Sequence, residues 1–357
     1  MTDQTADLSN EDSIGTSAKD KIVYGYRPGK TWPAPALVLY HLAMPYFLMS
    51  TIQSIAAGIA FIFYLNTPES SGIRSLFASI VSTAKAPPQN VNELMMKELM
   101  RFMSSAPCLI SMIIGYVAII ASYYLIVRVL EKRPAGTMGL PFGTSSDRKK
   151  ALLSYGKGLG IGLLMMSAVF FLLTLTGQSR VDRIGLEASS VPLFVIYILM
   201  WLPQGASEEI MTRGYMIPRL SARFGRVAAV GISSLYFGLL HSFNNGFSLP
   251  ALINLILFAV FAAFLALYAE NIWAVCAVHS VWNFAQGNLF GFEVSGTSTS
   301  SSVLLTKTSD GASALLTGGS FGPEGGLFVT AVLLVGIGVL ILLFRRKADA
   351  KKAEQAI

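Results

Sequence analysis

Two adjacent carboxylates stand out in a chain that is otherwise strongly apolar. Glu208 and Glu209 are followed one turn later by Arg213, in a segment with the composition of a membrane helix. A carboxylate at membrane depth is energetically costly, so an acidic pair there indicates a functional site. On a helix, residues four apart share a face, which predicts that Glu209 and Arg213 form an ion pair. Glu208 lies about 100° around the same helix, where it is free to face a cavity and act as a base.

Histidine is scarce, because the whole chain contains only 3 histidines. Two of them, His241 and His279, lie in apolar segments downstream of the acidic pair. The four-residue spacing predicts that His279 and Asn283 point the same way, and that Phe237 packs beneath His241. A carboxylate with an imidazole can deprotonate water, and a second imidazole with an amide can stabilise an oxyanion. The combination therefore predicts a hydrolytic site.

Each of these features also has a structural explanation when it is taken alone. An acidic pair can end a helix near lipid headgroups, and an intramembrane histidine can hydrogen-bond to a neighbouring helix. His41, the third histidine, has no patterned partner and is interpreted as a packing residue. The hydrolytic hypothesis depends on all three motifs occurring in order on three apolar segments.

A metal site is the alternative chemistry. Glu208, His241 and His279 have the types of a His₂Glu zinc site that keeps its fourth position open. Spacing alone does not separate this site from a metal-free one, although no HExxH pattern occurs on a single helix. The cofactor stays open at this point, with zinc as the candidate metal.

The composition predicts an all-α polytopic membrane bundle with an intramembrane polar cavity. The 357 residues are 53% hydrophobic and 13% charged, and the mean hydropathy is +0.57, whereas soluble domains have about 25% charged residues. Apolar runs of about 20 residues can each cross a bilayer. Cys108 and Cys276 lie in such runs, so no disulfide framework is indicated. About eight spans are expected, at residues 36–65, 106–127, 151–175, 191–220, 227–243, 249–268, 272–289 and 326–344.

The charge distribution predicts the orientation of the spans. The net charge of +7 reflects basic residues at segment ends, which is a membrane pattern and not a nucleic-acid signal. Basic loops alternate with nearly uncharged ones, so both termini are expected in the cytoplasm. Three regions are predicted: a disordered cytoplasmic tail at 1–30, a membrane domain at 31–345 with its core at about 190–290, and a basic cytoplasmic tail at 346–357.

Membrane depth puts one condition on the fourth span. His241 lies about 22 Å into the fifth span, at the usual rise per residue. If the fourth span ended at Thr212, Glu208 would lie at the cytoplasmic edge and could not meet His241. A fourth helix that runs to about Leu220 removes the conflict, so we expect a long, tilted or broken helix with Arg213 buried.

Three stretches carry a resemblance to a known family. They are Glu-Glu-Ile-Met-Thr-Arg-Gly-Tyr-Met-Ile-Pro-Arg-Leu at 208–220, Ser-Ser-Leu-Tyr-Phe-Gly-Leu-Leu-His at 233–241 and Ile-Trp-Ala-Val-Cys-Ala-Val-His at 272–279. This ordered set resembles the CPBP family of intramembrane proteases, which includes CAAX proteases, Rce1-type endopeptidases and many bacterial Abi proteins. The resemblance covers about residues 190–290.

The resemblance implies a role for each matching residue. Glu208 would activate the hydrolytic water with the help of His241, and His279 and Asn283 would bind the oxyanion. Glu209 and Arg213 would hold the motif together. The family has been described both as zinc-dependent and as glutamate-dependent, and we favour a site without a catalytic metal.

The resemblance does not name a substrate. We expect a membrane-associated or lipidated peptide or protein within the bilayer of a bacterial cell, and no nucleic-acid partner. Two rival functions remain: a catalytically silent immunity or scaffold protein of the same family, and a proton-coupled transporter. The intact set of polar residues argues against the first rival. The lack of an inverted repeat with paired broken helices argues against the second.

Overall fold

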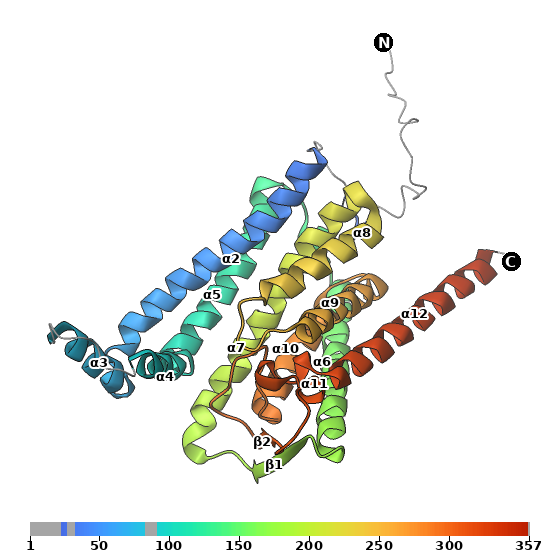
Figure 1. Ribbon diagram of the computed structural model, residues 1–357. Coiled ribbons are helices and arrows are strands. Elements are labelled where there is room, and N and C mark those ends of the chain that lie inside the picture. The colour runs from blue at the N-terminus through green and yellow to red at the C-terminus, as the bar shows by residue number, and fades with distance from the viewer. Residues whose placement is uncertain (1–22, 27–32, 83–90, 356–357) are drawn as a thin grey trace.

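Helices make up most of this chain in the computed structural model, which describes residues 23–26, 33–82 and 91–355 (Figure 1). Most of the tail expected at 1–30 lies outside these residues. The longer helices are α2 (Ala34–Tyr64), α3 (Ser71–Ser82), α4 (Val91–Met103), α5 (Ala106–Leu125), α6 (Ser145–Leu175), α7 (Val191–Glu209), α8 (Ile217–Leu240), α9 (Leu249–Ala269), α10 (Trp273–Phe284) and α12 (Leu327–Gln355). The short elements are η1 (Pro68–Ser70), η2 (Ile126–Leu130), η3 (Ala135–Met138), η4 (Ala188–Ser190), η5 (Ile210–Met216), η6 (Ala285–Leu289), α11 (Ala314–Thr317), η7 (Gly319–Phe321), η8 (Pro323–Gly325) and the strands β1 (Ser179–Ile184) and β2 (Leu304–Thr308).

Local sequence explains where several helices begin and end. Thr144 and Asp147 form a reciprocal capping box at the start of α6, with each side chain accepting from the other residue's backbone N–H. The Ser248 hydroxyl accepts from the Ala251 N–H at the start of α9. At the other end of α9, Glu270 adopts a left-handed conformation with a φ of 57°, which stops the helix.

The predicted fourth span is a long helix with an irregular middle. The α-helix α7 continues into the π-helical segment η5 and then into α8. Pro218 is the second residue of α8, just after η5, and has no N–H to continue a regular α-helical pattern. The chain turns at Gly225, whose φ of 80° and ψ of 163° are not helical. The fourth span therefore runs past Leu220, and Arg213 is 1% exposed, as expected.

The described residues include six helices that are long and apolar enough to cross a membrane. They are Pro35–Tyr64, Ala106–Leu130, Ser145–Leu175, Ala188–Leu240, Leu249–Ala269 and Leu327–Gln355. Ala188–Leu240 contains the break at Gly225 and covers two of the expected spans. The expected span at 272–289 is α10 with 12 residues and η6 with 5, which is not among the six. A polytopic helical bundle is thus confirmed, and the count of eight stays a prediction.

Small residues bring α10 into the centre of the bundle. A Cβ added at Gly158 or Gly162 of α6 would lie 2.2 Å from the Ala274 carbonyl oxygen or 2.5 Å from the Val281 side chain. Gly156 and Gly160 of the same helix have no such neighbours within 4 Å. On the other side, a Cβ at Gly205 of α7 would lie 2.7 Å from the Ser280 nitrogen. Glycine therefore permits the close packing that holds α10 between α6 and α7.

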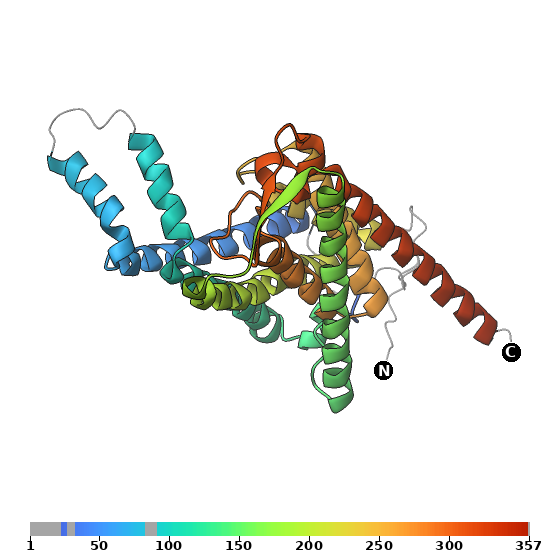
Figure 2. The same ribbon diagram turned by 90° about the horizontal axis from the view of Figure 1, so that it is seen from below.

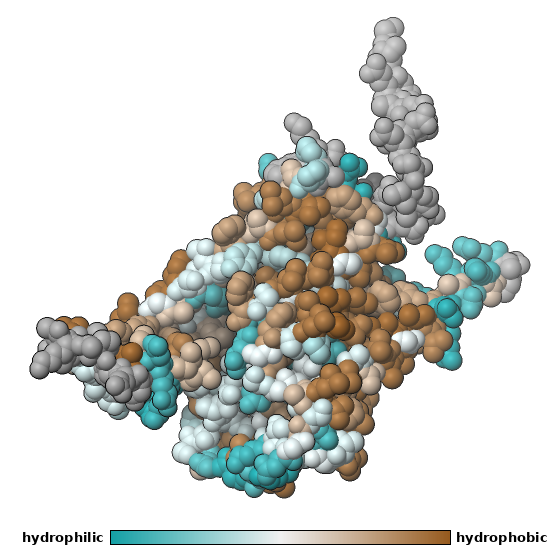
Figure 3. Space-filling view, viewed as in Figure 1, coloured by the Kyte–Doolittle hydropathy of each residue, from teal (hydrophilic) through white to brown (hydrophobic). Residues whose placement is uncertain are grey.

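The two ends of the bundle differ in structure. Antiparallel strands β1 and β2 pair at one end, from Ser179 with Thr308 to Ile184 with Leu304. Figure 1 shows this pair at the lower end, while the bend of α8 and the far end of α12 lie toward the upper end. Lys307 binds Asp182 at 2.6 Å across the strands and, together with Arg180, lowers the pKa of that carboxyl. In the space-filling view, apolar residues cover much of the middle, and polar ones gather over the strands (Figure 3).

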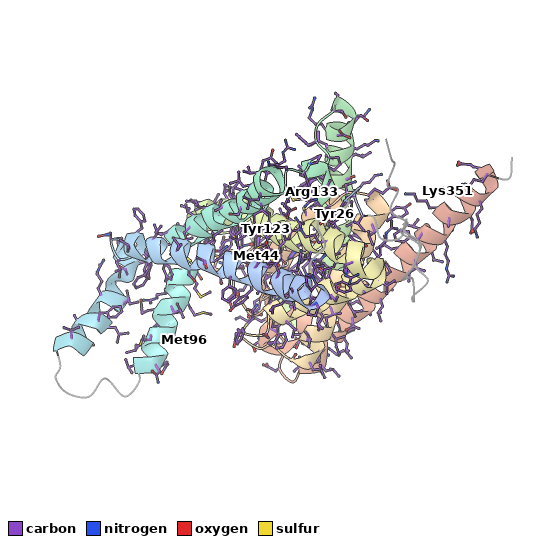
Figure 4. All side chains as sticks on the ribbon, turned by 90° about the horizontal axis from the view of Figure 1, so that it is seen from above. Tyr26, Met44, Met96, Tyr123, Arg133 and Lys351 are labelled. Atoms are coloured by element: carbon purple, nitrogen blue, oxygen red, sulfur yellow. The ribbon has the colours of Figure 1, made fainter. Side chains whose placement is uncertain are left out.

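Two helical regions extend away from the bundle. The helices α3 and α4 project from it side by side (Figure 2). The last helix, α12, continues without a break through residue 345, so the predicted basic tail is helical as far as Gln355. Lys351 lies near the outer end of this helix (Figure 4).

Candidate active site

A buried ion pair lies behind the candidate site. Arg213 Nη1 donates to Glu209 Oε1 at 3.2 Å, and both side chains are almost fully buried. The same oxygen accepts a hydrogen bond from His279 Nδ1 at 2.9 Å. Glu209 therefore does more than neutralise Arg213, because it also orients the imidazole of α10 and directs its other nitrogen, Nε2, away from the ion pair.

Residues of the π-helical segment η5 make further contacts that hold this ion pair in place. Arg213 Nη1 also donates to the Thr212 hydroxyl at 2.6 Å, and that hydroxyl donates to the Glu208 backbone carbonyl at 2.6 Å. The guanidinium carbon of Arg213 lies 4.9 Å from the centroid of the Phe237 ring. A π-helical turn within an α-helix is frequently found at a functional site.

Glu208 belongs to a second set of contacts on the cavity side. Its Oε1 accepts from Gln204 Nε2 at 2.7 Å, and Gln204 Oε1 accepts from Asn283 Nδ2 at 2.8 Å. Its Oε2 lies 3.8 Å from His279 Nε2, which is too long for a hydrogen bond. Among the described residues this Oε2 has no hydrogen-bond partner. One carboxylate oxygen is therefore held in place, and the other is available.

The other histidine lies where α8 ends. His241 Nδ1 donates to the Phe237 carbonyl oxygen at 2.9 Å, and the two rings are 4.9 Å apart between centroids. Phe237 also contacts the His279 ring at 5.9 Å, so one phenyl ring lies between the two imidazoles as well as against Arg213. Because a carbonyl oxygen can only accept, this bond places a hydrogen on Nδ1, which leaves Nε2 as the acceptor nitrogen of a neutral ring.

The four residues predicted to act in catalysis line one cavity. It has a volume of about 210 Å³, and its lining includes Glu208, His241, His279 and Asn283. Phe237 lines the cavity as well, whereas Glu209 and Arg213 lie behind it. The tertiary structure thus separates the two adjacent glutamates in the way the helical geometry predicts, with one at the cavity and one in the ion pair.

Several polar residues in the cavity wall had not been anticipated. Gln204 precedes Glu208 by four residues, and this spacing could have revealed it. Glu324 is 8% exposed and accepts hydrogen bonds from Trp282 Nε1 at 3.2 Å and from the Ser295 N–H at 2.7 Å. Asn254 donates to the backbone carbonyl of Glu324 at 2.8 Å. These three residues come from distant segments, and no local pattern marks Glu324 or Asn254.

The zinc alternative does not fit the side chains as they lie. Glu208, His241 and His279 face one cavity, but a metal ion needs its ligands to converge on one point at about 2.0–2.2 Å. Within residues 23–26, 33–82 and 91–355, no three His, Cys, Asp or Glu side chains are grouped in that way. We therefore derive no step through a metal.

His41 lies away from the cavity. It is 2% exposed, its Nδ1 donates to the Leu37 carbonyl oxygen at 2.7 Å, and its ring stacks on Tyr215 with centroids 5.7 Å apart. These contacts agree with its interpretation as a packing residue.

Comparison with protein families identifies this part of the chain. Residues 190–285 match the family described as Type II CAAX prenyl endopeptidase Rce1-like, which confirms the resemblance to the CPBP and CAAX proteases. The match covers α7 to α10, the helices that carry all three motifs. No curated protein and no solved structure matches the chain. The protein is thus an integral membrane protein, and its segment 190–285 is similar to Rce1-like endopeptidases.

Proposed function

We propose that this chain, with its Rce1-like segment at 190–285, is an intramembrane endopeptidase that cleaves a membrane-associated peptide or protein with a water activated by Glu208 and His241. The observation that carries the proposal is the shared cavity. It brings a partly unpaired carboxylate, two imidazoles and an amide together at a place that the bilayer would otherwise keep apolar.

The first step would be attack of water on the scissile carbonyl. Glu208 Oε2 has no partner among the described residues and would take one proton from the water. His241, whose Nε2 is the acceptor nitrogen, would hold the same water. The hydroxide forms the C–O bond, and the carbonyl π electrons move to the oxygen, which gives a tetrahedral oxyanion.

The oxyanion would be stabilised from α10. Asn283 uses one amide N–H for Gln204 and keeps the second for the substrate oxygen. A doubly protonated His279 would donate through Nδ1 to Glu209 and through Nε2 toward the cavity. The negative charges of Glu208 and Glu209 would then balance the positive charges of Arg213 and this imidazolium, so the cluster would carry no net charge. Collapse of the oxyanion would then break the C–N bond as Glu208 returns its proton to the leaving amine.

The test compares cells that express the wild type, Glu208→Gln or Glu270→Gln. Glu270 provides the same substitution at an exposed carboxylate, with 76% of its side chain accessible. Peptides released from membranes are identified by mass spectrometry in each strain. The proposal expects products that disappear with Glu208→Gln and persist with Glu270→Gln. If both variants release the wild-type set of peptides, Glu208 is not the base. A silent scaffold protein or a transporter would give no protein-dependent cleavage in any of the three strains.

A further inference from the structure

The cavity lies in one half of the bundle. Of the helices that begin toward the β1–β2 end, α5, α9 and α12 line the cavity with residues from their first halves, and α8 and α10, which finish there, line it with residues at or near their last turns. Met112 of α5, Phe258 of α9 and Val329 of α12 come from first turns or early halves, while His241 and Asn283 come from the ends of α8 and α10. The half that contains the cavity is therefore the one bordered by residues 176–190, 241–248 and 291–325.

The mouth of the cavity is at the same end. Three of its lining residues are also exposed at the surface: Met103 at the end of α4, which is 40% exposed, and Thr297 and Ser298 in the loop before β2. Two side chains anchor that loop. Asn244 donates to the Ser295 carbonyl oxygen at 2.9 Å, and the Glu324 carboxylate accepts from the Ser295 backbone N–H. The opening thus lies between α4 and a loop that is anchored to the cavity wall.

The opposite end of the bundle carries most of the basic residues. In the described residues, this end has Arg128, Lys132, Arg133, Arg148, Lys149, Lys150, Arg219, Arg223, Arg226, Arg345, Arg346, Lys347, Lys351 and Lys352. The end with the cavity mouth has Arg74, Lys97, Arg101, Arg180, Arg183 and Lys307, and most of these form ion pairs with nearby acids. Lysine and arginine near the ends of spans favour the cytoplasmic side, which places the mouth on the other side.

We infer that the cavity opens toward the extracytoplasmic face of the membrane. This inference rests on the proposed function and narrows its substrate class to segments exposed at the outer surface, such as the outer juxtamembrane part of a membrane-anchored or exported protein. A prenylated carboxy-terminal tail that is held at the cytoplasmic surface would face the closed end of the bundle. The family description alone would favour that tail as the substrate, and the position of the cavity opposes it.

The orientation is tested by labelling single cysteines in the full-length protein. Cys108 and Cys276 are buried, at 5% and 1% exposure, and are first replaced by alanine. One cysteine is then introduced as Thr297→Cys at the mouth, Asp310→Cys at the same end outside the cavity, or Ala350→Cys on the exposed part of α12. Spheroplasts are treated with a membrane-impermeant maleimide before or after permeabilisation.

The inference expects Thr297→Cys and Asp310→Cys to be labelled in intact spheroplasts, and Ala350→Cys only after permeabilisation. The reverse pattern, or equal labelling of all three, overturns it. This outcome does not depend on catalysis, so it is separate from failure of the proposed function.

A second readout tests whether the substrate enters through this mouth. A bulky maleimide on Thr297→Cys should suppress release of the cleaved peptides by about 10-fold or more, because the adduct fills the entrance. The same adduct on Asp310→Cys should leave release unchanged. If labelled Thr297→Cys still cleaves at the unlabelled rate, the substrate enters elsewhere and the proposed substrate class is wrong.

Discussion

Two clusters of charged residues each include residues of the long helical segment Ala188–Leu240, and they differ in how completely their charges are paired. The first is the acid–histidine cluster of Glu208, Glu209, Arg213 and His279. Among the described residues, Oε2 of each glutamate and Nη2 of Arg213 lack a hydrogen-bond partner, and the cavity lies beside them. Buried polar groups that are left without partners cost free energy, and in native proteins such groups are often found at functional sites.

The second is the Arg219 cluster, which lies near the basic end of the bundle. Arg219 donates to both oxygens of Glu131, and Arg133 Nε donates to the same carboxylate at 2.8 Å. The guanidinium of Arg219 stacks on the Tyr215 ring at 3.4 Å, and that of Arg133 lies over Tyr26 at 4.4 Å (Figure 4). Each charge here has a partner, which is the pattern of a cluster that stabilises the fold. Charge alone therefore does not distinguish the candidate site from the Arg219 cluster. The candidate site differs because some of its charged groups lack partners and because it borders a cavity.

The largest expected effect is that substitutions in the two clusters change different properties: activity in the acid–histidine cluster and stability in the Arg219 cluster. Glu208→Gln should lower proteolysis by roughly 10²–10⁴-fold, because the amide cannot take a proton from water. The unfolding temperature of this variant in detergent should stay close to that of the wild type. Glu131→Gln should do the opposite, with lower stability and normal activity per folded molecule. Retained hydrolysis in purified Glu208→Gln, measured on the peptides found in cells, would show that the base is another residue.

Removal of the buried cation should cause the largest loss of stability. Arg213→Leu leaves Glu209 buried without its ion-pair partner, which should cost about 3–5 kcal/mol of unfolding free energy. The matched control is Arg183→Leu, which removes an exposed pair with Glu187 and should cost about 1 kcal/mol or less. Unfolding in detergent with increasing denaturant measures both values. Equal losses in the two variants would mean that the Arg213 pair is accessible to water.

Gln204 should affect turnover more than folding. Gln204→Leu removes the side chain that holds Glu208 and Asn283 together, so kcat should fall by about 10- to 100-fold through misplacement of both groups. KM should change little, and Gln204→Glu should not restore the rate because it adds a like charge beside Glu208. Gln178→Leu is the control, at a half-buried glutamine outside the cavity lining whose side chain accepts from the Ser313 N–H. A variant with unchanged kcat would show that this contact does not position the catalytic groups.

The Arg219 cluster should give a smaller effect that depends on pH. Burial raises the pKa of the Glu131 carboxyl, but the hydrogen bonds and charges of Arg219 and Arg133 outweigh it and lower that pKa below its usual value. A carboxyl with a lowered folded-state pKa stabilises the fold fully above its unfolded pKa, and this contribution is lost as pH falls through the folded pKa. The difference in unfolding temperature between wild type and Glu131→Gln should thus be constant from pH 8 to about pH 5 and shrink below about pH 4. A difference that grows on acidification would contradict this sign.

The smallest effect is expected from metal removal. If the acid–histidine cluster works as an acid–base network, thorough chelation of divalent metals should leave the cleavage rate within about twofold of the untreated enzyme. Elemental analysis of the same sample shows whether metal was removed. Activity that is lost on chelation and restored by zinc would assign a metal to the site, while the protease assignment would stand.

The residue types and their spacing were sufficient to predict the helical class, the three motifs and the different positions of Glu208 and Glu209. These features follow from helix geometry and from the cost of burying charge in a membrane, and both act locally along the chain. The length of the fourth helix was predictable too, because His241 and Glu208 had to reach one depth. The structure confirms that this helix runs past Leu220, and it adds the π-helical turn and the break at Gly225.

Only the tertiary structure decided which distant groups meet. The contact between Glu209 and His279 joins residues 70 positions apart, and Glu324 meets Trp282 across 42 positions. The loop that forms part of the cavity mouth, and the position of that mouth at one end of the bundle, depend on how α10 packs between α6 and α7. A sequence specifies local periodicity directly, but such long-range contacts arise only when whole helices pack together, so no short pattern in the chain encodes them.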